Sequence, residues 1–262
     1  MTPEPGALTV NEHDRSESGY RASHLGAARA RDYDPQFWAS SSARALDWDL
    51  EQNILDRVFA HDLAPSPTCA LDFACGTGRV LRYLESRIPQ TIGVDIAEGM
   101  LAYARPRCPE SRLVKHDVTT GLHPDVPSSV DVVTAFRFFL NAEPDLRRDV
   151  LAWMRSVLGT RGTLIANFHL NPRSLRGRYL LLRWRGRRRT AMVSPREAER
   201  VLADAGFDVQ ARYGYEYLPY RRDGNQLCAA GLRRRVEICL LNRRRIADLG
   251  GAFIVVARPR CD

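Results

Sequence analysis

Lysine is almost missing from this sequence of 262 residues, because all but one of its 39 basic residues are arginine and Lys115 is the exception. A GC-rich genome, which favours arginine codons, accounts for that preference. It does not account for where the arginines lie. Residues 1–170 carry 18 basic and 22 acidic residues, whereas residues 171–262 carry 21 and 9. This gathering of positive charge indicates an anionic partner near the C-terminal third of the chain.

Long apolar runs are also absent. No segment approaches the roughly 18 apolar residues that cross a bilayer, and the first twenty residues have no apolar stretch typical of a secretion signal. The six cysteines are scattered and form no C-x-x-C pair, which argues against a zinc or iron–sulfur site and fits a reducing compartment. We therefore expect a cytoplasmic protein with no metal site, whose contact with a membrane is peripheral at most.

The order of apolar segments predicts the fold class. Residues 1–32 are polar and predicted to be flexible, and residues 33–262 are predicted to form one domain. A helical pattern runs from Pro35 to about residue 60, and short apolar strands then alternate with amphipathic helices. This rhythm predicts an α/β fold: a doubly wound, mostly parallel seven-stranded sheet with helices on both faces, an N-terminal helical cap and a basic insertion after the fifth strand.

The segment LDFACGTG, residues 71–78, reads as a strand that enters a tight glycine turn. A dinucleotide loop has a third glycine where this chain has Leu81, which weakens that interpretation, and the Lys-Ser/Thr pair of a phosphate-binding loop is missing. S-adenosylmethionine is the remaining cofactor. Gly76 and Gly78 would let the backbone pass close to its methionine part, and Asp72 could orient the loop or accept from the cofactor ammonium group. Glycine is usual at position 74, so Ala74 fits best if its φ is negative.

Four segments in this order resemble the motifs of the class I, Rossmann-like S-adenosylmethionine-dependent methyltransferases: LDFACGTGRV, IGVDIAEGML, VKHDV and VDVVTAFRFF. The resemblance covers about residues 35–260. The layout is similar to that of methyltransferases in ubiquinone, menaquinone, sugar and natural-product biosynthesis. It implies S-adenosylmethionine as the cofactor and methyl transfer as the reaction.

The resemblance also implies roles for individual residues. Asp95 would accept from the ribose hydroxyls of the cofactor, and Ile96 and Met100 would pack against its adenine. Asp117 would accept from the adenine amino group, with Val118 beside it. An aspartate before a helix often serves only as a helix cap, and that interpretation stays open for both carboxylates.

Further positions follow from the same resemblance. Ala135 and Phe136 would end the fourth strand beside the methyl-bearing sulfur. Tyr33 and Trp38 would cover the cofactor from the N-terminal helix, although aromatic residues at this spacing are equally typical of a core.

The acceptor side is less constrained by the sequence. His169, after the fifth strand, is the candidate general base, and a structural histidine is an equal alternative. Arg137 and Asn141 are candidates for orienting the acceptor. The D/N-P-P-Y/F motif of nucleobase amino methylation and the Pro-Cys pair of cytosine C5 methylation are missing, which leaves a small-molecule acceptor with an O or N nucleophile, in bacterial specialised metabolism.

Residues 171–192 form the predicted basic insertion, or lid. Their apolar and arginine side chains suit a phosphate-bearing, nucleotide-linked or lipid-linked acceptor, an anionic bilayer, or simply a solvated surface. Nucleic acid is less favoured because no recognised binding module accompanies the charge. An RNA- or DNA-associated methyltransferase, or a cofactor-binding protein without catalysis, remains the alternative function.

Overall fold

A computed structural model describes residues 43–63, 66–183, 192–218, 230–241 and 243–260. Within them, seven strands form one sheet in the order β3-β2-β1-β4-β5-β7-β6. The strands are β1 (Cys69–Phe73), β2 (Gln90–Asp95), β3 (Arg112–Lys115), β4 (Val130–Ala135), β5 (Leu158–His169), β6 (Phe207–Tyr215) and β7 (Ala252–Pro259). The helices are α2 (Ala43–His61), α3 (Arg79–Glu85), α4 (Glu98–Ala104), α5 (Pro144–Val157), α6 (Leu175–Arg183), α7 (Pro195–Asp204) and α8 (Ala230–Leu241), with 3-10 turns η3 (Val118–Thr120) and η4 (Arg244–Leu249).

The sheet has a parallel part and an antiparallel part. Strands β3, β2, β1, β4 and β5 pair in parallel, whereas β7 runs antiparallel between β5 and β6. The carboxyl ends of β1, β2, β4 and β5 therefore meet at one end of the sheet, where open α/β sheets bind ligands. The predicted mostly parallel, seven-stranded sheet is confirmed.

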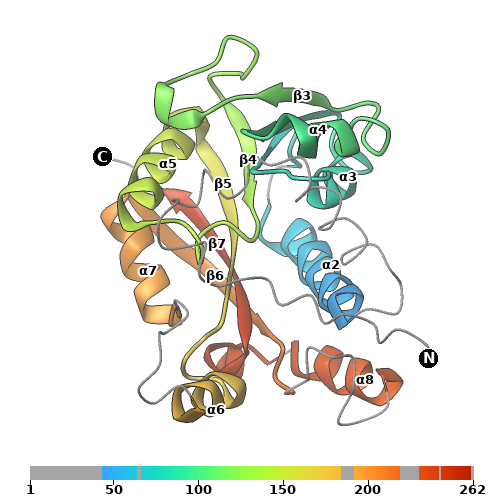
Figure 1. The fold of residues 1–262 in the computed structure, drawn as a ribbon, viewed down its shortest axis with the longest axis vertical. Helices are drawn as coiled ribbons and strands as arrows, with labels where there is room; N and C mark the ends of the chain where they lie inside the picture. The colour runs from blue at the N-terminus through green and yellow to red at the C-terminus, as the bar shows by residue number, and fades with distance from the viewer. Residues whose placement is uncertain (1–42, 64–65, 184–191, 219–229, 242, 261–262) are drawn as a thin grey trace, which may run out of the picture.

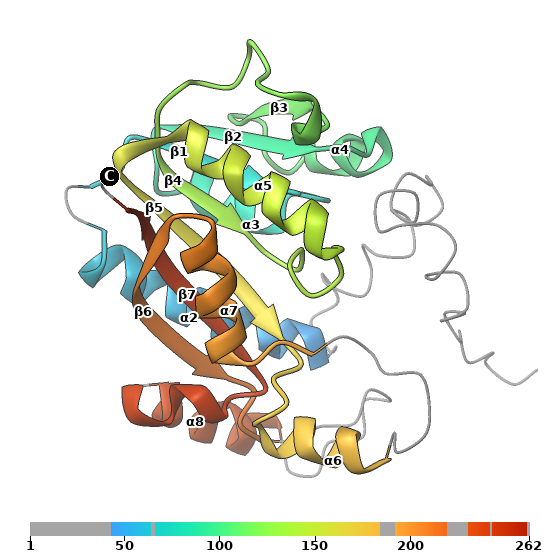
Figure 2. The same ribbon diagram turned by 90° about the vertical axis from the view of Figure 1, so that its left-hand side faces the viewer.

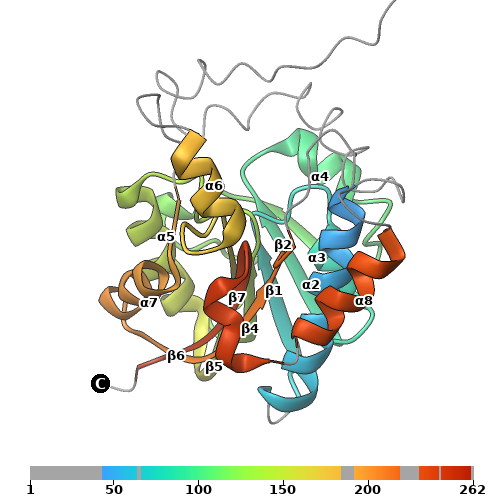
Figure 3. The ribbon, with the colours of Figure 1, turned by 90° about the horizontal axis from the view of Figure 1, so that it is seen from below.

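Helices cover both faces of the sheet, as Figures 1 and 3 show. On one face, the apolar side chains of α5 and α7 pack against sheet residues such as Phe73 and Phe168. On the other face, α2 and α3 pack against Ala70, Ile165 and Ile254. Strands buried on both sides explain the nearly continuous apolar runs of the sequence.

Local sequence signals set several element boundaries. Ser194 caps α7 and forms a capping box with Glu197, as the S-P-R-E pattern predicts. Gly206, just past the end of that helix, has a φ of 80°, a conformation that glycine adopts without strain. β5 begins at Leu158, directly after α5, four residues earlier than the apolar run from Gly162 predicts.

Some predictions fall on segments outside the described residues. The N-terminal helix predicted from Pro35 is described as α2 only from Ala43, and the predicted flexible segment 1–32 is not described. Residues 171–183 of the predicted insertion are described, as α6 and the turn before it. The division into residues 1–32 and 33–262 stays a prediction.

Candidate functional site

The glycine turn connects β1 to α3 through three residues in the left-handed region. Ala74, Gly76 and Gly78 have φ values of 51°, 56° and 86°. The expectation of a negative φ at Ala74 is therefore wrong: the turn needs the same backbone shape that glycine usually provides there, and alanine adopts it at a steric cost. The backbone N–H of Cys75 donates to the carbonyl oxygen of Val94 at 3.1 Å, which fastens the turn to β2.

Space for a ligand is left open at the turn. Among the described residues, and apart from its chain neighbours, the nearest atom to a Cβ added at Gly76 would be the carbonyl oxygen of Ala74, at 3.9 Å. A Cβ at Gly78 would instead come within 2.9 Å of the Cys108 sulfur. The absence of a side chain at Gly76 thus leaves space beside the turn, whereas the absence of one at Gly78 lets the turn pack closely against Ala104 of α4 and Cys108.

Asp72 lies at the end of β1 and is almost fully buried. Its Oδ1 accepts from the Thr134 hydroxyl at 2.6 Å, while among the described residues its Oδ2 has no partner at hydrogen-bond geometry, although the backbone N–H of Leu81 is near enough to lower the pKa of this carboxyl group. Burial raises the pKa of Asp72 to about 7, although Thr134 and Arg79 act in the opposite direction. A buried acceptor with no donor is costly, which makes Asp72 a candidate to accept from a cationic ligand group.

Asp95 ends β2 and faces the same turn. Its Oδ2 accepts from the backbone N–H of Gly76 at 2.8 Å and its Oδ1 from that of Ala97 at 2.9 Å. Burial raises its pKa, opposed by these backbone hydrogen bonds. Each oxygen keeps lone-pair capacity beyond one bond, so Asp95 can join the turn to α4 and still accept from a ligand. Met100 is buried beside Ala97, and Ile96 packs against both.

Asp117 caps the short turn η3. Its Oδ1 accepts from the backbone N–H and the hydroxyl of Thr119, at 3.1 and 2.7 Å. Val118 is buried next to it. The helix-cap interpretation of Asp117 is therefore correct, and its role toward an adenine stays a prediction.

The end of β4 carries a strained residue. Ala135 and Phe136 are buried, and Arg137, which follows them, has a φ of 63°. The backbone N–H of Arg137 donates to the Asn167 side-chain oxygen at 2.5 Å, and its carbonyl oxygen accepts from the Asn141 amide at 3.1 Å. Asn141 is itself exposed. It thus holds the backbone at Arg137, whereas the orienting role toward an acceptor stays a prediction.

Glu51, on α2, is a central residue that the sequence interpretation missed. It is fully buried and accepts from Arg79 at 2.5 Å, from the Tyr215 hydroxyl at 2.7 Å and from the Asn167 amide at 3.2 Å. The Arg137 guanidinium lies 3.4 Å away. Burial opposes ionisation of Glu51, but the two guanidinium groups outweigh it and hold its pKa below the usual value. One carboxylate thus joins α2 to α3, to the segment that follows β4, and to β5 and β6.

A sequence signal for Glu51 did exist. It lies three residues before Ile54 and seven before Val58, on the buried side of the same helix. A carboxylate on an apolar helical stripe needs a buried cation.

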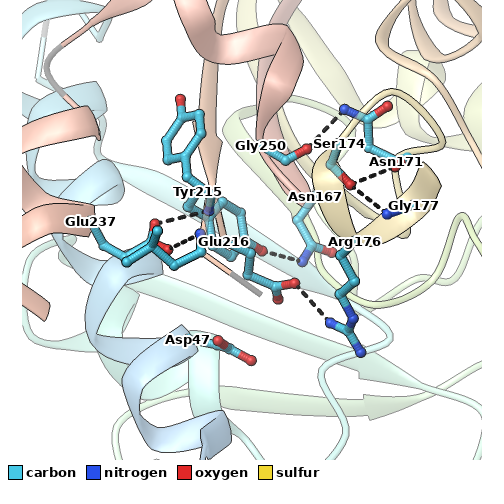
Figure 4. A network of polar contacts seen from close by, with 12 residues as sticks. Asp47, Asn167, Asn171, Ser174, Arg176, Gly177, Tyr215, Glu216, Glu237 and Gly250 are labelled. Atoms are coloured by element: carbon cyan, nitrogen blue, oxygen red, sulfur yellow. Dashed lines mark hydrogen bonds and ion pairs between the residues drawn. The ribbon is translucent and has the colours of Figure 1, made fainter. Parts of the chain in front are cut away.

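A second buried polar group lies beyond β6, as Figure 4 shows. Glu216 has a φ of 58° and accepts from Arg176 of α6 at 3.2 Å. Glu237 of α8 accepts from the backbone N–H of Tyr217 and Leu218 at 3.1 and 2.8 Å. Asp47 of α2 points toward this group (Figure 4), and burial together with the charge of Glu216 raises the pKa of Asp47 to about 8. Acidic residues of α2 and α8, together with Glu216, therefore lie around the carboxyl end of β6.

His169 ends β5 and is half-buried. It follows Asn167 by two residues, so both side chains are on the same face of the sheet, the face that carries Glu51. The structure thus brings His169, Arg137 and the glycine turn to one end of the sheet. Tyr33 and Trp38 lie outside the described residues. Within the described part of the chain, no three His, Cys, Asp or Glu side chains gather in a way that could hold a metal ion.

Comparison with known proteins identifies a methyltransferase domain within the chain. Residues 70–162 match the model of a methyltransferase-domain family, and these residues contain the glycine turn, Asp95, Asp117 and the end of β4. Domains of this kind use S-adenosylmethionine, so the predicted methyltransferase class and its cofactor are confirmed for this part of the chain, while the residue assignments stay predictions.

The curated relatives of this chain are distant. A trans-aconitate 2-methyltransferase of Yersinia pseudotuberculosis is 30% identical over 140 residues, which are 51% of this chain and 48% of that protein. A dTDP-3-amino-3,4,6-trideoxy-alpha-D-glucopyranose N,N-dimethyltransferase of Streptomyces venezuelae is 37% identical over 76 residues, 29% of this chain and 31% of that one. The chain thus spans about half the length, or less, of the curated relatives it matches.

Solved structures extend the similarity over the whole fold. The magnesium protoporphyrin IX methyltransferase from Synechocystis PCC 6803, with bound S-adenosylhomocysteine, has a TM-score of 0.60 at 14% identity and covers 92% of this chain and 97% of its own. A TehB-like methyltransferase from Corynebacterium glutamicum has a TM-score of 0.54 at 16% identity, covering 90% and 100%. At these identities the likeness shows the fold alone.

Proposed function

We propose that this protein transfers the methyl group of S-adenosylmethionine to an O or N nucleophile of an anionic small-molecule acceptor, in bacterial specialised metabolism. The observation that carries the proposal is the unpaired, buried Oδ2 of Asp72 beside the open left-handed turn at Gly76. A cationic group next to an open backbone is what this arrangement accommodates. The ammonium group of the cofactor's methionine part supplies such a cation.

The described residues fit the rest of the cofactor as well. Asp95 keeps acceptor capacity for two ribose hydroxyls, and Ile96 with Met100 offers an apolar surface for the adenine. When bound, the cofactor supplies a methyl group already activated on a sulfonium. The protein must then place a nucleophile in line with that methyl group, and positioning of this kind can lower a barrier by roughly 7–11 kcal/mol.

The guanidinium group of Arg137, at the end of β4, supports an anionic acceptor. It pairs with the buried Glu51, which also pairs with Arg79. Arg137 is held in a strained conformation by Asn167 and directly follows the residues predicted to lie beside the sulfur. A rigid guanidinium there can grip a carboxylate or phosphate of the acceptor. The name of one relative contains a carboxylic acid, trans-aconitate, which agrees with this choice.

His169 is the proposed general base. It lies at the carboxyl end of β5 on the face that carries Arg137's partners, so an acceptor held by Arg137 would have this imidazole on the neighbouring strand. A base in this place would remove the proton from an acceptor hydroxyl or ammonium group and add about 10²–10⁴-fold to the rate.

Cofactor binding is tested by calorimetric titration with S-adenosylhomocysteine. We expect binding by the wild type and a loss of at least about tenfold in Asp95→Asn, because each charged hydrogen bond to the ribose contributes roughly 1.5–3 kcal/mol. Asp131→Asn is the matched control: Asp131 also joins segments through backbone N–H groups, those of Thr68 and Cys69, but at the amino end of the sheet. No binding by the wild type, or equal losses in both variants, would contradict the proposal.

Methyl transfer is tested with labelled S-adenosylmethionine and a panel of carboxylate-bearing, phosphate-bearing and amino-sugar acceptors. We expect turnover with an anionic member, a large loss in Arg137→Gln and His169→Gln, and unchanged affinity for S-adenosylhomocysteine in both. Turnover only with neutral acceptors would contradict the proposal that the acceptor is anionic. Salt-dependent binding of RNA or DNA, without small-molecule turnover, would favour the nucleic-acid alternative.

A further inference from the structure

Exposed apolar side chains are concentrated at one end of this molecule. Among the described residues, seven large apolar side chains are exposed, and all but Leu122 belong to α6, α8 or η4: Leu175, Tyr179, Leu181, Leu182, Leu232 and Leu249. Figures 1 and 2 both place α6 and α8 at the same end of the molecule, away from β3. Single exposed leucines are ordinary, but six in three neighbouring elements indicate a contact surface.

The outer face of α6 is the most exposed part of this surface. Leu175, Tyr179 and Leu182 are separated by four and three residues, so they lie on one face of the helix. Their exposed fractions are 66%, 55% and 65%. The opposite side of α6 is the one packed on the protein, since Gly177 is buried there against the carbonyl oxygen of Asn171.

Positive charge surrounds these side chains. The elements α6, α8 and η4 contain eight arginines and two acidic residues. Arg178 is exposed on the outer side of α6, and Arg235, Arg243 and Arg245 are exposed on α8 and beside it. Leucine and tyrosine side chains flanked by arginine are typical of a helix that lies at the headgroup level of an anionic bilayer.

A firm connection joins α6 to the proposed acceptor site. Arg176 pairs with the buried Glu216 at the carboxyl end of β6. The turn before α6 is held by Asn171, whose amide donates to the carbonyl oxygens of Asp248 and Gly250 at 2.8 Å each, and by Ser174, whose hydroxyl accepts from Gly177 (Figure 4). The apolar face is therefore fixed relative to the strand ends, which a membrane-presented acceptor would have to approach.

We infer that α6 is an interfacial helix that seats this end of the protein on an anionic lipid bilayer. Leu175, Tyr179 and Leu182 enter the boundary between headgroups and acyl chains, and the exposed arginines contact the lipid phosphates: Arg178, Arg235, Arg243 and Arg245. None of the described helices has the length and apolar character to cross a bilayer, so the contact is peripheral. This inference rests on the proposed function only for the purpose of the membrane contact, which is to give the enzyme access to a lipid-linked acceptor.

The test is sedimentation of the full chain with vesicles, without cofactor or acceptor, so its failure is distinct from failure of the methyl-transfer proposal. Vesicles of equal parts phosphatidylglycerol and phosphatidylcholine are compared with vesicles of phosphatidylcholine alone. We expect the wild type to bind the anionic vesicles at least about tenfold more tightly, with binding that weakens as salt rises.

The triple variant Leu175→Ser, Tyr179→Ser, Leu182→Ser is expected to lose at least about tenfold in partitioning, because the apolar contact is removed. Leu122→Ser is the matched control: Leu122 is 61% exposed but lies in the connection between η3 and β4, outside α6, α8 and η4. Circular dichroism and thermal unfolding report folding of both variants. Arg178→Ser is expected to weaken binding to anionic vesicles while leaving binding to neutral ones unchanged.

Equal binding by the wild type and the triple variant, or no binding by the wild type to anionic vesicles, overturns the inference. A wild-type dimer that the triple variant converts to a monomer, with no vesicle binding by either, identifies a second copy of the chain as the occupant and overturns it as well.

Discussion

At the scale of single residues, three strained or unsatisfied positions lie at the carboxyl ends of β1 and β4. Ala74 and Arg137 occupy the left-handed region without being glycine, and among the described residues one oxygen of Asp72 has no donor. Strain and unpaired polar atoms of this kind cost free energy in the folded protein. They persist where a ligand or a fixed geometry depends on them.

Replacing Ala74 by glycine tests the strain directly. The Cβ at a φ of 51° is unfavourable, so Ala74→Gly should raise the free energy of unfolding by about 0.5–1 kcal/mol. Ala102→Gly, at an exposed position of α4, should lower it by about 1 kcal/mol because glycine weakens a helix. Urea unfolding of both variants measures the two changes, and a loss in both would show that Ala74 is not strained.

Asp72 should release a proton when the cofactor binds. In the free protein, burial holds the pKa of Asp72 at about 7, so the carboxyl group is largely protonated slightly below neutral pH. A cationic ammonium group beside it favours the ionised form and lowers that pKa. Calorimetric titration with S-adenosylhomocysteine near pH 6.5, in buffers of different ionisation enthalpy, should report proton release for the wild type and markedly less for Asp72→Asn. Equal release by both would place the ammonium group elsewhere.

At the scale of elements, the buried carboxylate of Glu51 connects the helical cap to the sheet. The polar hub defined by Glu51, Arg79, Arg137, Asn167 and Tyr215 draws on α2, α3, β4, β5 and β6. Each partner alone would be an expensive buried group, and together they satisfy one another. The hub therefore fixes the position of α2 over the strand ends and the direction of the Arg137 side chain.

Glu51→Gln should destabilise the protein strongly. It removes the charge that balances two buried guanidinium groups, and an uncompensated buried charge typically costs about 3–5 kcal/mol. Asp49→Asn is the control on the same helix: Asp49 pairs with Arg234 at 2.7 Å, but both side chains are at least one-third exposed, so its loss should cost less than about 1 kcal/mol. Free energies of unfolding in urea compare the two, and similar losses would mean that the hub is not a stabilising unit.

At the scale of the whole molecule, buried acids set how stability depends on pH. Burial, with the charge of Glu216, raises the pKa of Asp47 to about 8, and burial raises that of Asp72 to about 7. The folded protein thus keeps protons that the unfolded chain releases above about pH 4. The contribution of Asp47 and Asp72 to the free energy of unfolding is complete below that pH and is lost as the pH rises toward 7 and 8. The pKa of Glu51 is lowered instead, so its contribution is present at neutral pH and is lost only in acid.

We therefore expect the ligand-free protein to be most stable in mild acid, near about pH 5, and to lose thermal stability toward pH 8. Asp47→Asn should flatten this decline, since the variant has no proton to release at that position. Calorimetric scans across this pH range measure both. A transition temperature that rises from pH 5 to pH 8, or an equally steep decline in the variant, would contradict the assignment.

The charge distribution also belongs to this scale. Arginine gathers in the last third of the sequence, and folding brings part of it to the end of the molecule that carries α6 and α8 (Figure 2). Folding also divides that charge: Arg176 and Arg233 are buried or nearly so, whereas Arg178, Arg235 and Arg243 remain exposed. Composition alone does not separate structural arginines from those free to meet a partner.

The sequence by itself determined the elements, their order and the cofactor loop. Apolar runs between amphipathic stretches define strands and helices because burial follows local periodicity. The S-P-R-E start of α7 and the glycine turn after β1 depend only on neighbouring residues. Gly78 and Asp95 likewise lie within one β–α–β unit, so the resemblance of this short segment was enough to predict a cofactor-binding role for Asp95.

Only the tertiary structure decided what joins distant segments. The insertion of β7 between β5 and β6 depends on pairing across the sheet, and no local pattern specifies a strand's neighbours. The hub around Glu51 joins residues up to 164 positions apart, so each member looked like an ordinary polar residue. Whether the apolar side chains of α6 face the core or the solvent was likewise undecided, because the periodicity of a helix defines a face but not what that face meets.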